Sequence, residues 1–243
     1  MTIREKILIG IAGVALLLSG ACRRFPGEPE GSAEAPGEKS SVNFDQLYAQ
    51  NCAGCHGANG QGGPALALAN PIYLAVAPDA SIRRTVAQGI RGTMMPAFAT
   101  TFGGMLTDAQ IDELVRGLKE KWSRPEAEAI AGAPPYSRDL TGDPSRGAVD
   151  FQVNCSQCHG HNGEGGPKAG DVVDDSFLAL VSDQGLRTTI LAGRPDLGHP
   201  DWRGDGSHQP LTDQELTDIV AWLGSKRVTA PGRPYPGPKE ATN

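Results

Sequence analysis

Apolar side chains recur with helical spacing in two separate stretches of the chain. In both stretches they occupy positions i, i+3, i+4 and i+7, which lie on one face of an α-helix. They are Ile111, Leu114, Val115 and Leu118 in the first stretch, and Leu216, Ile219, Val220 and Leu223 in the second. A capping-box sequence precedes each stretch, Thr107 with Gln110 and Thr212 with Glu215. We therefore predict two amphipathic helices that pack their apolar faces into a core.

A shorter amphipathic segment stands well before each of these helices. Phe44, Leu47 and Tyr48 have helical spacing in the first, and Ala148 and Phe151 in the second. We find no convincing strand pattern, which would show as alternating apolar and polar residues. The chain is therefore predicted to be all-α.

The residues between these helices repeat as well. Residues 51–57 (Asn-Cys-Ala-Gly-Cys-His-Gly) match residues 154–160 (Asn-Cys-Ser-Gln-Cys-His-Gly) at an offset of 103, and a Gly-Gly-Pro sequence follows at the same offset. The Leu-Thr-Asp sequences that begin at positions 106 and 211 are 105 apart. Such a match with only a short insertion indicates an internal duplication.

The duplication and the Pro-rich stretches predict the domain organisation. We expect a first domain at 44–122, a linker at 123–142, a second domain at 143–227 and a Pro-rich tail at 228–243. A chain with 32 glycines, 19 prolines and 5% aromatic residues suits two small, loop-rich domains better than one large core. Small domains bury little surface and usually need an additional covalent or cofactor link.

The N-terminus is typical of an export signal. Arg4 and Lys6 precede an apolar run over 7–18, and a Ser-Gly-Ala-Cys sequence follows and ends at Cys22. This pattern predicts a bacterial lipoprotein signal peptide at 1–21, with lipid attached to Cys22. An uncleaved anchor helix is the alternative, although the run is short for a membrane span.

Residues 22–43 are rich in Pro, Gly, Glu and Ser, which predicts a flexible tether. With either kind of N-terminal anchor, the domains are expected on the periplasmic, extracytoplasmic side of the membrane. The formal net charge of −6 argues against nucleic acid as a partner and suits docking to a basic protein surface.

The other four cysteines form two copies of one motif, Cys52-x-x-Cys55-His56 and Cys155-x-x-Cys158-His159. This is the attachment motif of c-type haem. Two thiols at this spacing can share one face of a helical turn and reach the two vinyl groups on one porphyrin edge, and the adjacent histidine can reach the iron. The alternatives are a zinc site, for which the first motif lacks a further nearby Cys or His, and a thioredoxin-like pair. We predict two covalently bound haem c groups.

Both halves resemble class I cytochrome c domains, which contain an N-terminal helix, the attachment motif, a Gly-Pro loop, a distal-ligand loop and a C-terminal helix. The resemblance implies two tandem small helical domains joined by the Pro-rich linker. It makes His56 and His159 the proximal iron ligands. In the family, the proline after the glycines directs its carbonyl to the proximal histidine, and Pro64 and Pro167 match that position.

The same resemblance predicts the second ligand of each iron. In the first domain the Met-Pro loop makes Met95 the ligand, whereas Met94 and Met105 are expected to be packing residues. In the second domain His199 stands where methionine is expected, six residues after a glycine and directly before a proline, as Met95 does. His208 and an open or water-bound iron are the alternatives. His161 is too near the proximal motif to cross the ring.

Two fully ligated irons leave no site for a substrate, so we expect electron transfer and no catalysis. The halves are similar to dihaem cytochrome c subunits of respiratory complexes. The resemblance implies redox protein partners, such as a quinol-oxidising complex, an oxidase, a reaction centre or a dehydrogenase, in a respiratory or photosynthetic chain. The alternatives are the haem subunit of a periplasmic dehydrogenase, a dihaem peroxidase-like enzyme and a gas sensor.

Overall fold

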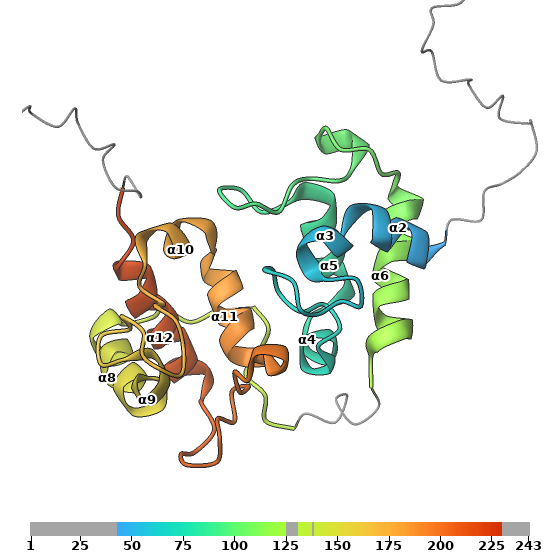
Figure 1. The fold of residues 1–243 in the computed structure, drawn as a ribbon. Helices are drawn as coiled ribbons and strands as arrows, with labels where there is room; N and C mark the ends of the chain where they lie inside the picture. The colour runs from blue at the N-terminus through green and yellow to red at the C-terminus, as the bar shows by residue number, and fades with distance from the viewer. Residues whose placement is uncertain (1–42, 125–130, 138, 230–243) are drawn as a thin grey trace, which may run out of the picture. The chain divides into compact units, whose positions relative to one another are not determined.

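The computed structural model describes residues 43–124, 131–137 and 139–229 (Figure 1). The predicted signal peptide, Cys22, the tether up to residue 42 and the tail from residue 230 lie outside this range. The described residues all belong to one compact unit. Within the described residues, none of the helices has the length and apolar character that crossing a membrane requires.

Among the described residues, five α-helices lie in the first half of the chain, and five corresponding α-helices lie in the second. The first set is α2 (Phe44–Asn51), α3 (Ala53–His56), α4 (Pro71–Val76), α5 (Asp79–Gln88) and α6 (Asp108–Trp122). The second set is α8 (Pro144–Asn154), α9 (Ser156–His159), α10 (Asp175–Leu180), α11 (Asp183–Ala192) and α12 (Asp213–Ser225). Single turns of 3₁₀ helix occur at η1 (Thr100–Phe102) and η2 (Pro195–Leu197). The described residues contain two isolated bridges and no strand, so the all-α prediction is confirmed.

In the first half, α2 packs against α6 through a glycine. A Cβ atom at Gly117 of α6 would overlap the ring of Phe44, so the glycine allows the two helices to approach closely. Phe44 and Tyr48 both meet the Trp122 ring edge-on, at centroid distances of 5.6 and 5.0 Å. The apolar stripe of α6 predicted from the sequence is buried, and its capping box is formed.

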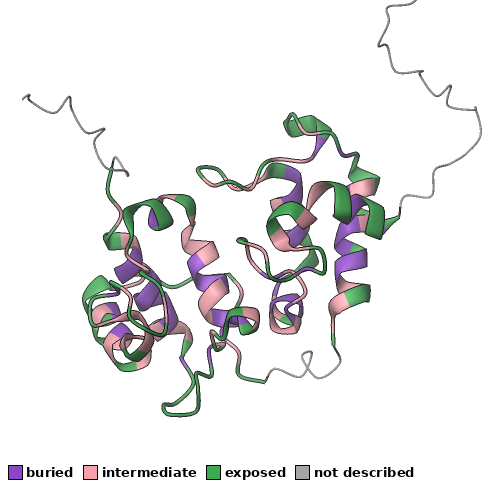
Figure 2. Cartoon of the chain, viewed as in Figure 1, coloured by how far each residue is buried: buried purple, intermediate pink, exposed green. Residues whose placement is uncertain are grey.

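The second half repeats this contact with α8 and α12, but the glycine is on the other helix. A Cβ atom at Gly147 of α8 would overlap the backbone oxygen of Asp218 on α12. Phe151 packs on Trp222 with ring centroids 4.4 Å apart. The predicted stripe of α12 is buried, and its capping box is also formed. In Figure 2 the buried residues follow the inner faces of α6 and α12.

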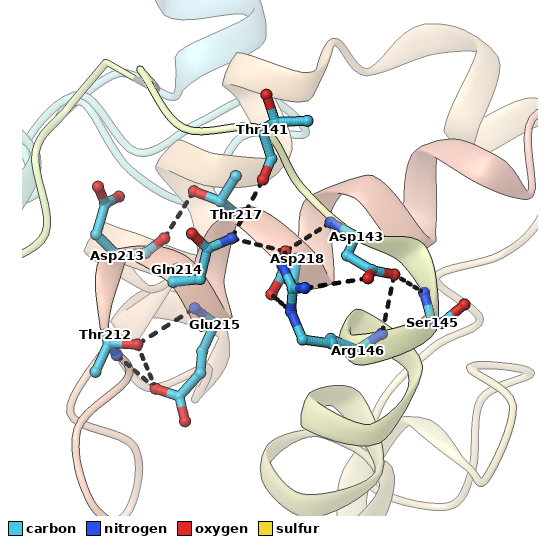
Figure 3. A network of polar contacts seen from close by, with 10 residues as sticks. All are labelled: Thr141, Asp143, Ser145, Arg146, Thr212, Asp213, Gln214, Glu215, Thr217 and Asp218. Carbon is cyan, nitrogen blue, oxygen red and sulfur yellow. Dashed lines mark hydrogen bonds and ion pairs between the residues drawn. The ribbon is translucent and has the colours of Figure 1, made fainter.

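A polar network fastens the start of α8 to the side of α12 (Figure 3). The Asp218 side chain is 1% exposed and accepts hydrogen bonds from Arg146 Nε at 2.8 Å and from the Asp143 N–H at 2.6 Å. Gln214 Nε2 donates to the same carboxylate at 2.9 Å. Burial would raise the pKa of Asp218, but the donors that surround it hold its pKa below the usual range.

The described part of the predicted linker packs against helices. Arg187 of α11 is fully buried, and its Nη2 donates to the Pro135 carbonyl at 2.6 Å and binds Asp213 of α12. The Tyr136 carbonyl accepts from Gln184 at 2.9 Å, while its ring lies 6.4 Å from that of Tyr73 in α4. Tyr136 therefore contacts both halves of the chain.

Candidate haem sites

Each attachment motif lies on a short turn directly after the first helix of its half. The Cys52 N–H donates to the Tyr48 carbonyl of α2 at 2.8 Å, and the His56 N–H then donates to Cys52 at 3.0 Å. The second motif repeats both bonds, Cys155 to Phe151 at 2.8 Å and His159 to Cys155 at 3.1 Å. Cys52, Cys55, Cys155 and Cys158 are all unpaired. Both cysteines and the histidine of each motif are thus held on one turn of backbone.

Each turn ends at a glycine with positive φ, 82° at Gly57 and 81° at Gly160. A side chain at Gly57 would also overlap the Gln61 carbonyl, so glycine is required there for both conformation and space. The chain can therefore leave the turn abruptly and fold back over it as the Gly-Pro loop.

In each half a backbone carbonyl from this loop contacts the proximal imidazole. His56 Nδ1 lies 2.7 Å from the Leu66 oxygen, and His159 Nδ1 lies 2.9 Å from the Gly170 oxygen. A proton on Nδ1 would donate to the carbonyl and leave Nε2 free to bind iron. The imidazoles are thus oriented as a haem ligand requires.

These acceptors correct the expectation that Pro64 and Pro167 supply the carbonyls. The Ala65 N–H donates to Cys55 at 3.0 Å. In a trans peptide the preceding Pro64 carbonyl points the opposite way, so a later carbonyl turns toward the ring. In the second half, the Gly166 N–H donates to the Ala169 carbonyl at 2.9 Å and closes a turn around Pro167, and the acceptor at His159 is the Gly170 carbonyl that follows this turn.

The two distal loops begin and close in the same way. Gly89 ends α5 with φ 67°, and Gly193 ends α11 with φ 70°. The Ile90 N–H donates to the Met95 carbonyl at 3.0 Å, and the Arg194 N–H donates to the His199 carbonyl at 3.0 Å.

The two glycines also face equivalent backbone atoms. A Cβ atom at Gly89 would lie 2.6 Å from the Met95 oxygen, and one at Gly193 would lie 2.8 Å from the His199 oxygen. Met95 and His199 therefore occupy the same position in the two loops. The assignment of Met95 as a ligand rests on this loop position.

In the second half the two proposed ligands face each other. The rings of His159 and His199 have centroids 6.0 Å apart, with 53° between their planes. Two imidazole–metal bonds of about 2.0 Å each would place the ligating nitrogens about 4 Å apart. Each ring centroid lies behind its nitrogen, so the centroids would be further apart than the nitrogens, and the observed separation of 6.0 Å agrees with this.

His199 has the character of a buried ligand, whereas its rivals do not. Its Nδ1 is buried and is the one buried side-chain polar atom of the described residues without a hydrogen-bond partner. Burial and the neighbouring His159 lower the pKa of His199, which favours the neutral imidazole that binds iron. His208 and His161 are exposed. The residues of this half fit a haem held between two histidines.

Met94 and Met105 are not the packing residues that the sequence suggested. Their exposed fractions are 76% and 83%. The Thr93 N–H donates to Ile90 at 3.1 Å, which places Met94 at the tip of the distal loop. The Leu106 N–H donates to Phe98 at 2.7 Å, which turns Leu106 inward and leaves Met105 outside.

A contact between the two halves was not anticipated from the sequence. Arg194, in the second distal loop, donates to the Gly63 carbonyl in the Gly-Gly-Pro loop of the first half at 3.0 Å. Burial lowers the pKa of His56, and the positive charge of Arg194 adds to that effect. When the two copies are aligned, Arg194 falls opposite Ile90. A charged residue at a position that is apolar in the other copy is the one sequence feature that could have indicated a special role for Arg194.

The fold and the paired Cys-x-x-Cys-His motifs define a protein with tandem cytochrome c domains, a class whose members bind haem c covalently. The chain belongs to the family of cytochrome c oxidase, cbb3-type, subunit III, which matches residues 43–116 and 142–223. These two matches fall on the two copies of the duplicated unit.

Several curated proteins are similar to the chain over most of its length. The cbb3-type cytochrome c oxidase subunit FixP of Azorhizobium caulinodans is 30% identical over 73% of this chain and 57% of its own. The cytochrome bc1 complex cytochrome c subunit of Mycobacterium tuberculosis is 28% identical over 73% of this chain and 60% of its own. The chain thus spans less than two thirds of either relative.

Among solved structures, a chain of the Kuenenia stuttgartiensis reducing HAO-like protein complex aligns with 80% of this chain and 100% of its own, at 20% identity and a TM-score of 0.43. A likeness at that level supports no statement about function.

Proposed function

We propose that the chain carries two haem c groups and passes electrons one at a time between membrane-associated or periplasmic redox proteins. The observation that carries this proposal is the repetition of the whole site. Both halves have the attachment turn, a carbonyl at the proximal Nδ1 and a closed distal loop that presents a ligand at one position. When bound, haem supplies a reversible ferric–ferrous couple.

The chain's own residues would attach, orient and tune that group. Cys52 and Cys55 would form thioethers in the first half, and Cys155 and Cys158 in the second. The iron ligands would be His56 with Met95, and His159 with His199. The carbonyls of Leu66 and Gly170 would keep each proximal ring in one orientation, so little rearrangement would accompany a change of oxidation state.

The proposed partners are large redox complexes of the membrane. Relatives of the chain are subunits of a cbb3-type oxidase and of a cytochrome bc1 complex. We propose a similar setting here, with lipid on Cys22 and the domains on the periplasmic side. A lipid and a flexible tether would raise the effective concentration of the domains near such complexes.

Intact mass spectrometry and a haem-stained denaturing gel test the cofactor part of this proposal. Two haems should remain attached after acid-acetone extraction, because four thioethers would hold them. A mass increase of one haem, or extraction of the haem, would contradict it. A steady-state peroxide assay with a reduced donor separates a carrier from the peroxidase-like alternative, since a carrier with two ligands on each iron should show no turnover.

A further inference from the structure

The second distal loop is fastened to the first half by a buried pair of charged residues. The Arg194 side chain is 10% exposed and that of Asp196 is 9% exposed. Arg194 Nη2 donates to Asp196 at 2.8 Å and to the Gly63 carbonyl at 3.0 Å. The Asp196 carboxylate also accepts from the Gly62 N–H at 3.1 Å. Both charged groups therefore reach the Gly-Gly-Pro loop that folds over the first haem motif.

Asn70 makes a second link between the same two regions. It is 2% exposed, and its Oδ1 caps α4 by accepting from the Ile72 and Tyr73 N–H groups at 2.8 and 3.1 Å. Its Nδ2 donates to the carbonyl of Ala192, the last residue of α11, at 2.8 Å and to that of Gly193, the residue after the helix, at 3.2 Å. These two residues lead directly into the loop that carries His199.

The duplicated unit shows that neither residue type is needed for the fold alone. Asp174 caps α10 at the place where Asn70 caps α4, and it accepts the same pair of backbone bonds. An aspartate is therefore sufficient as a cap, but its carboxylate side chain, unlike the asparagine amide, has no N–H to donate. Ile90 likewise closes the first distal loop, since its N–H donates to the Met95 carbonyl as the Arg194 N–H donates to His199. The return bond differs, because the Met95 N–H donates to the Thr93 side chain. The side-chain donors of Asn70 and Arg194 serve the contact between the halves.

Arg194 also holds His199 directly through its backbone. The Arg194 N–H donates to the His199 carbonyl, and the His199 N–H donates back to the Arg194 carbonyl, both at 3.0 Å. The residue whose side chain is bound to the first half is thus the backbone partner of the second distal ligand. A displacement of Arg194 would be transmitted to His199 without an intermediate residue.

We propose that Arg194, Asp196 and Asn70 form a latch between the halves, through which the first domain sets the position of His199 and so couples the two haem sites. In this arrangement Arg194 is a positioning residue. The proposal rests on His199 being an iron ligand. It makes the reduction potential and ligation of the second haem depend on a contact with the first domain.

The test uses three variants of the full-length holoprotein. Arg194→Ile introduces the residue that the first copy has and removes the donors to Gly63. Arg194→Lys keeps the charge but cannot form the same planar fork. Asn70→Asp keeps the cap on α4 and removes the side-chain donor to Ala192 and Gly193. Residue 70 itself lies outside the loop that contains His199.

Arg203→Lys provides the matched control. Arg203 pairs with Asp201 two residues away, as Arg194 pairs with Asp196, but it is 55% exposed. Each variant is examined by redox titration, by electron paramagnetic resonance of the ferric second haem and by carbon monoxide binding to the ferrous form. Haem content and the thermal unfolding midpoint show that each variant is folded.

We expect Arg194→Ile and Asn70→Asp to shift the second haem's potential and ferric spectrum in the same direction, and to raise its carbon monoxide binding several-fold. Arg194→Lys should give an intermediate effect, and Arg203→Lys none. If Arg194→Ile alters the second haem and Asn70→Asp does not, Arg194 acts only within its own loop and the latch is overturned. If all four variants match the parent protein, it is overturned as well.

His199→Ala distinguishes failure of the latch from failure of the ligand assignment. If this variant opens the iron to carbon monoxide and the latch variants do not, the coupling alone is wrong. If it leaves the second haem unchanged, His199 is not the ligand, and both proposals fail together.

Discussion

Met95 and His199 end equivalent loops, but they would offer iron different chemistry. A thioether is a soft ligand that favours ferrous iron, whereas an imidazole is harder and favours the ferric form. Both loops begin at equivalent glycines and are closed by equivalent backbone bonds, so the two side chains are presented at matching positions.

The first prediction concerns reduction potential. The first haem should have the higher potential, and His199→Met should raise that of the second by on the order of 0.1 V, because axial ligands span about 0.8 V among haem proteins. Redox titration of the parent and the variant measures this. The ferric parent should also show the thioether–iron charge-transfer band from one haem only. A lower potential for the first haem would mean that burial and charge outweigh the ligand.

The second prediction concerns access to the second iron. His199→Ala should open the ferrous haem to carbon monoxide, because the buried ring that faces His159 is removed. His208→Ala is the control and should change nothing, since His208 is exposed. Carbon monoxide difference spectra measure both. The opposite pattern would show that the haem-bound protein recruits His208 as its ligand.

At the scale of the elements, a close helix contact builds each half. Gly117 allows α6 to meet α2, and Gly147 allows α8 to meet α12. Gly117 is on the later helix of its pair and Gly147 is on the earlier helix of its pair. The duplicated halves therefore achieve the same close helix contact with a glycine at different places.

The third prediction tests that packing. In an unconstrained helix Gly→Ala should stabilise by about 1 kcal/mol. Gly147→Ala should instead destabilise by about 1–3 kcal/mol, because the new methyl group would overlap the backbone of α12. Gly170→Ala, where a Cβ atom meets open space, is the control. Denaturant unfolding measures both, and a stabilised Gly147→Ala would show that the helices lie further apart.

The fourth prediction concerns the carboxylate between α8 and α12. The pKa of Asp218 is lower in the folded protein than its usual value. It therefore stabilises the fold above that usual value, about 3.9, and this contribution is lost as the pH falls through the lower, folded pKa. Asp218→Asn should lower the unfolding midpoint at neutral pH, and the difference from the parent should shrink as the pH falls below about 4. A difference independent of pH would contradict the assignment.

At the scale of the whole molecule, contacts between described residues join the two halves of the chain. Arg194, Asn70 and Tyr136 all contact residues of both halves. The two halves are therefore not structurally independent, and under the proposed function we expect the properties of one haem site to depend on the other half.

The fifth prediction concerns the membrane. Cys22→Ser should move most of the protein from the membrane to the soluble fraction with both haems attached, because the proposed lipid is its anchor. Haem-stained gels of the two fractions measure this, and Ser32→Ala in the same tether is the control. Retention of Cys22→Ser would instead indicate an uncleaved anchor helix or tight binding to a partner.

The sequence by itself determined the features that depend on neighbouring residues. The stripes of α6 and α12, their capping boxes and the duplicated Cys-x-x-Cys-His turn are local patterns, and the structure has each of them where it was expected. The alignment of His199 with Met95 also follows from local spacing, because both loops begin at a helix-ending glycine. Helix formation and turn geometry act over a few residues, so sequence patterns report them well.

Only the tertiary structure decided which groups meet across long stretches of chain. The carbonyls at the proximal histidines come from Leu66 and Gly170, residues that follow the expected prolines in each loop. In the first loop the bond from the Ala65 N–H to Cys55 turns the Pro64 carbonyl away. The contact of Arg194 with Gly63 joins residues 131 positions apart. No local sequence pattern identifies Gly63 as the partner of Arg194. Such pairs depend on which surfaces the folded helices bring together, and each polar group buried there needs a hydrogen-bond partner.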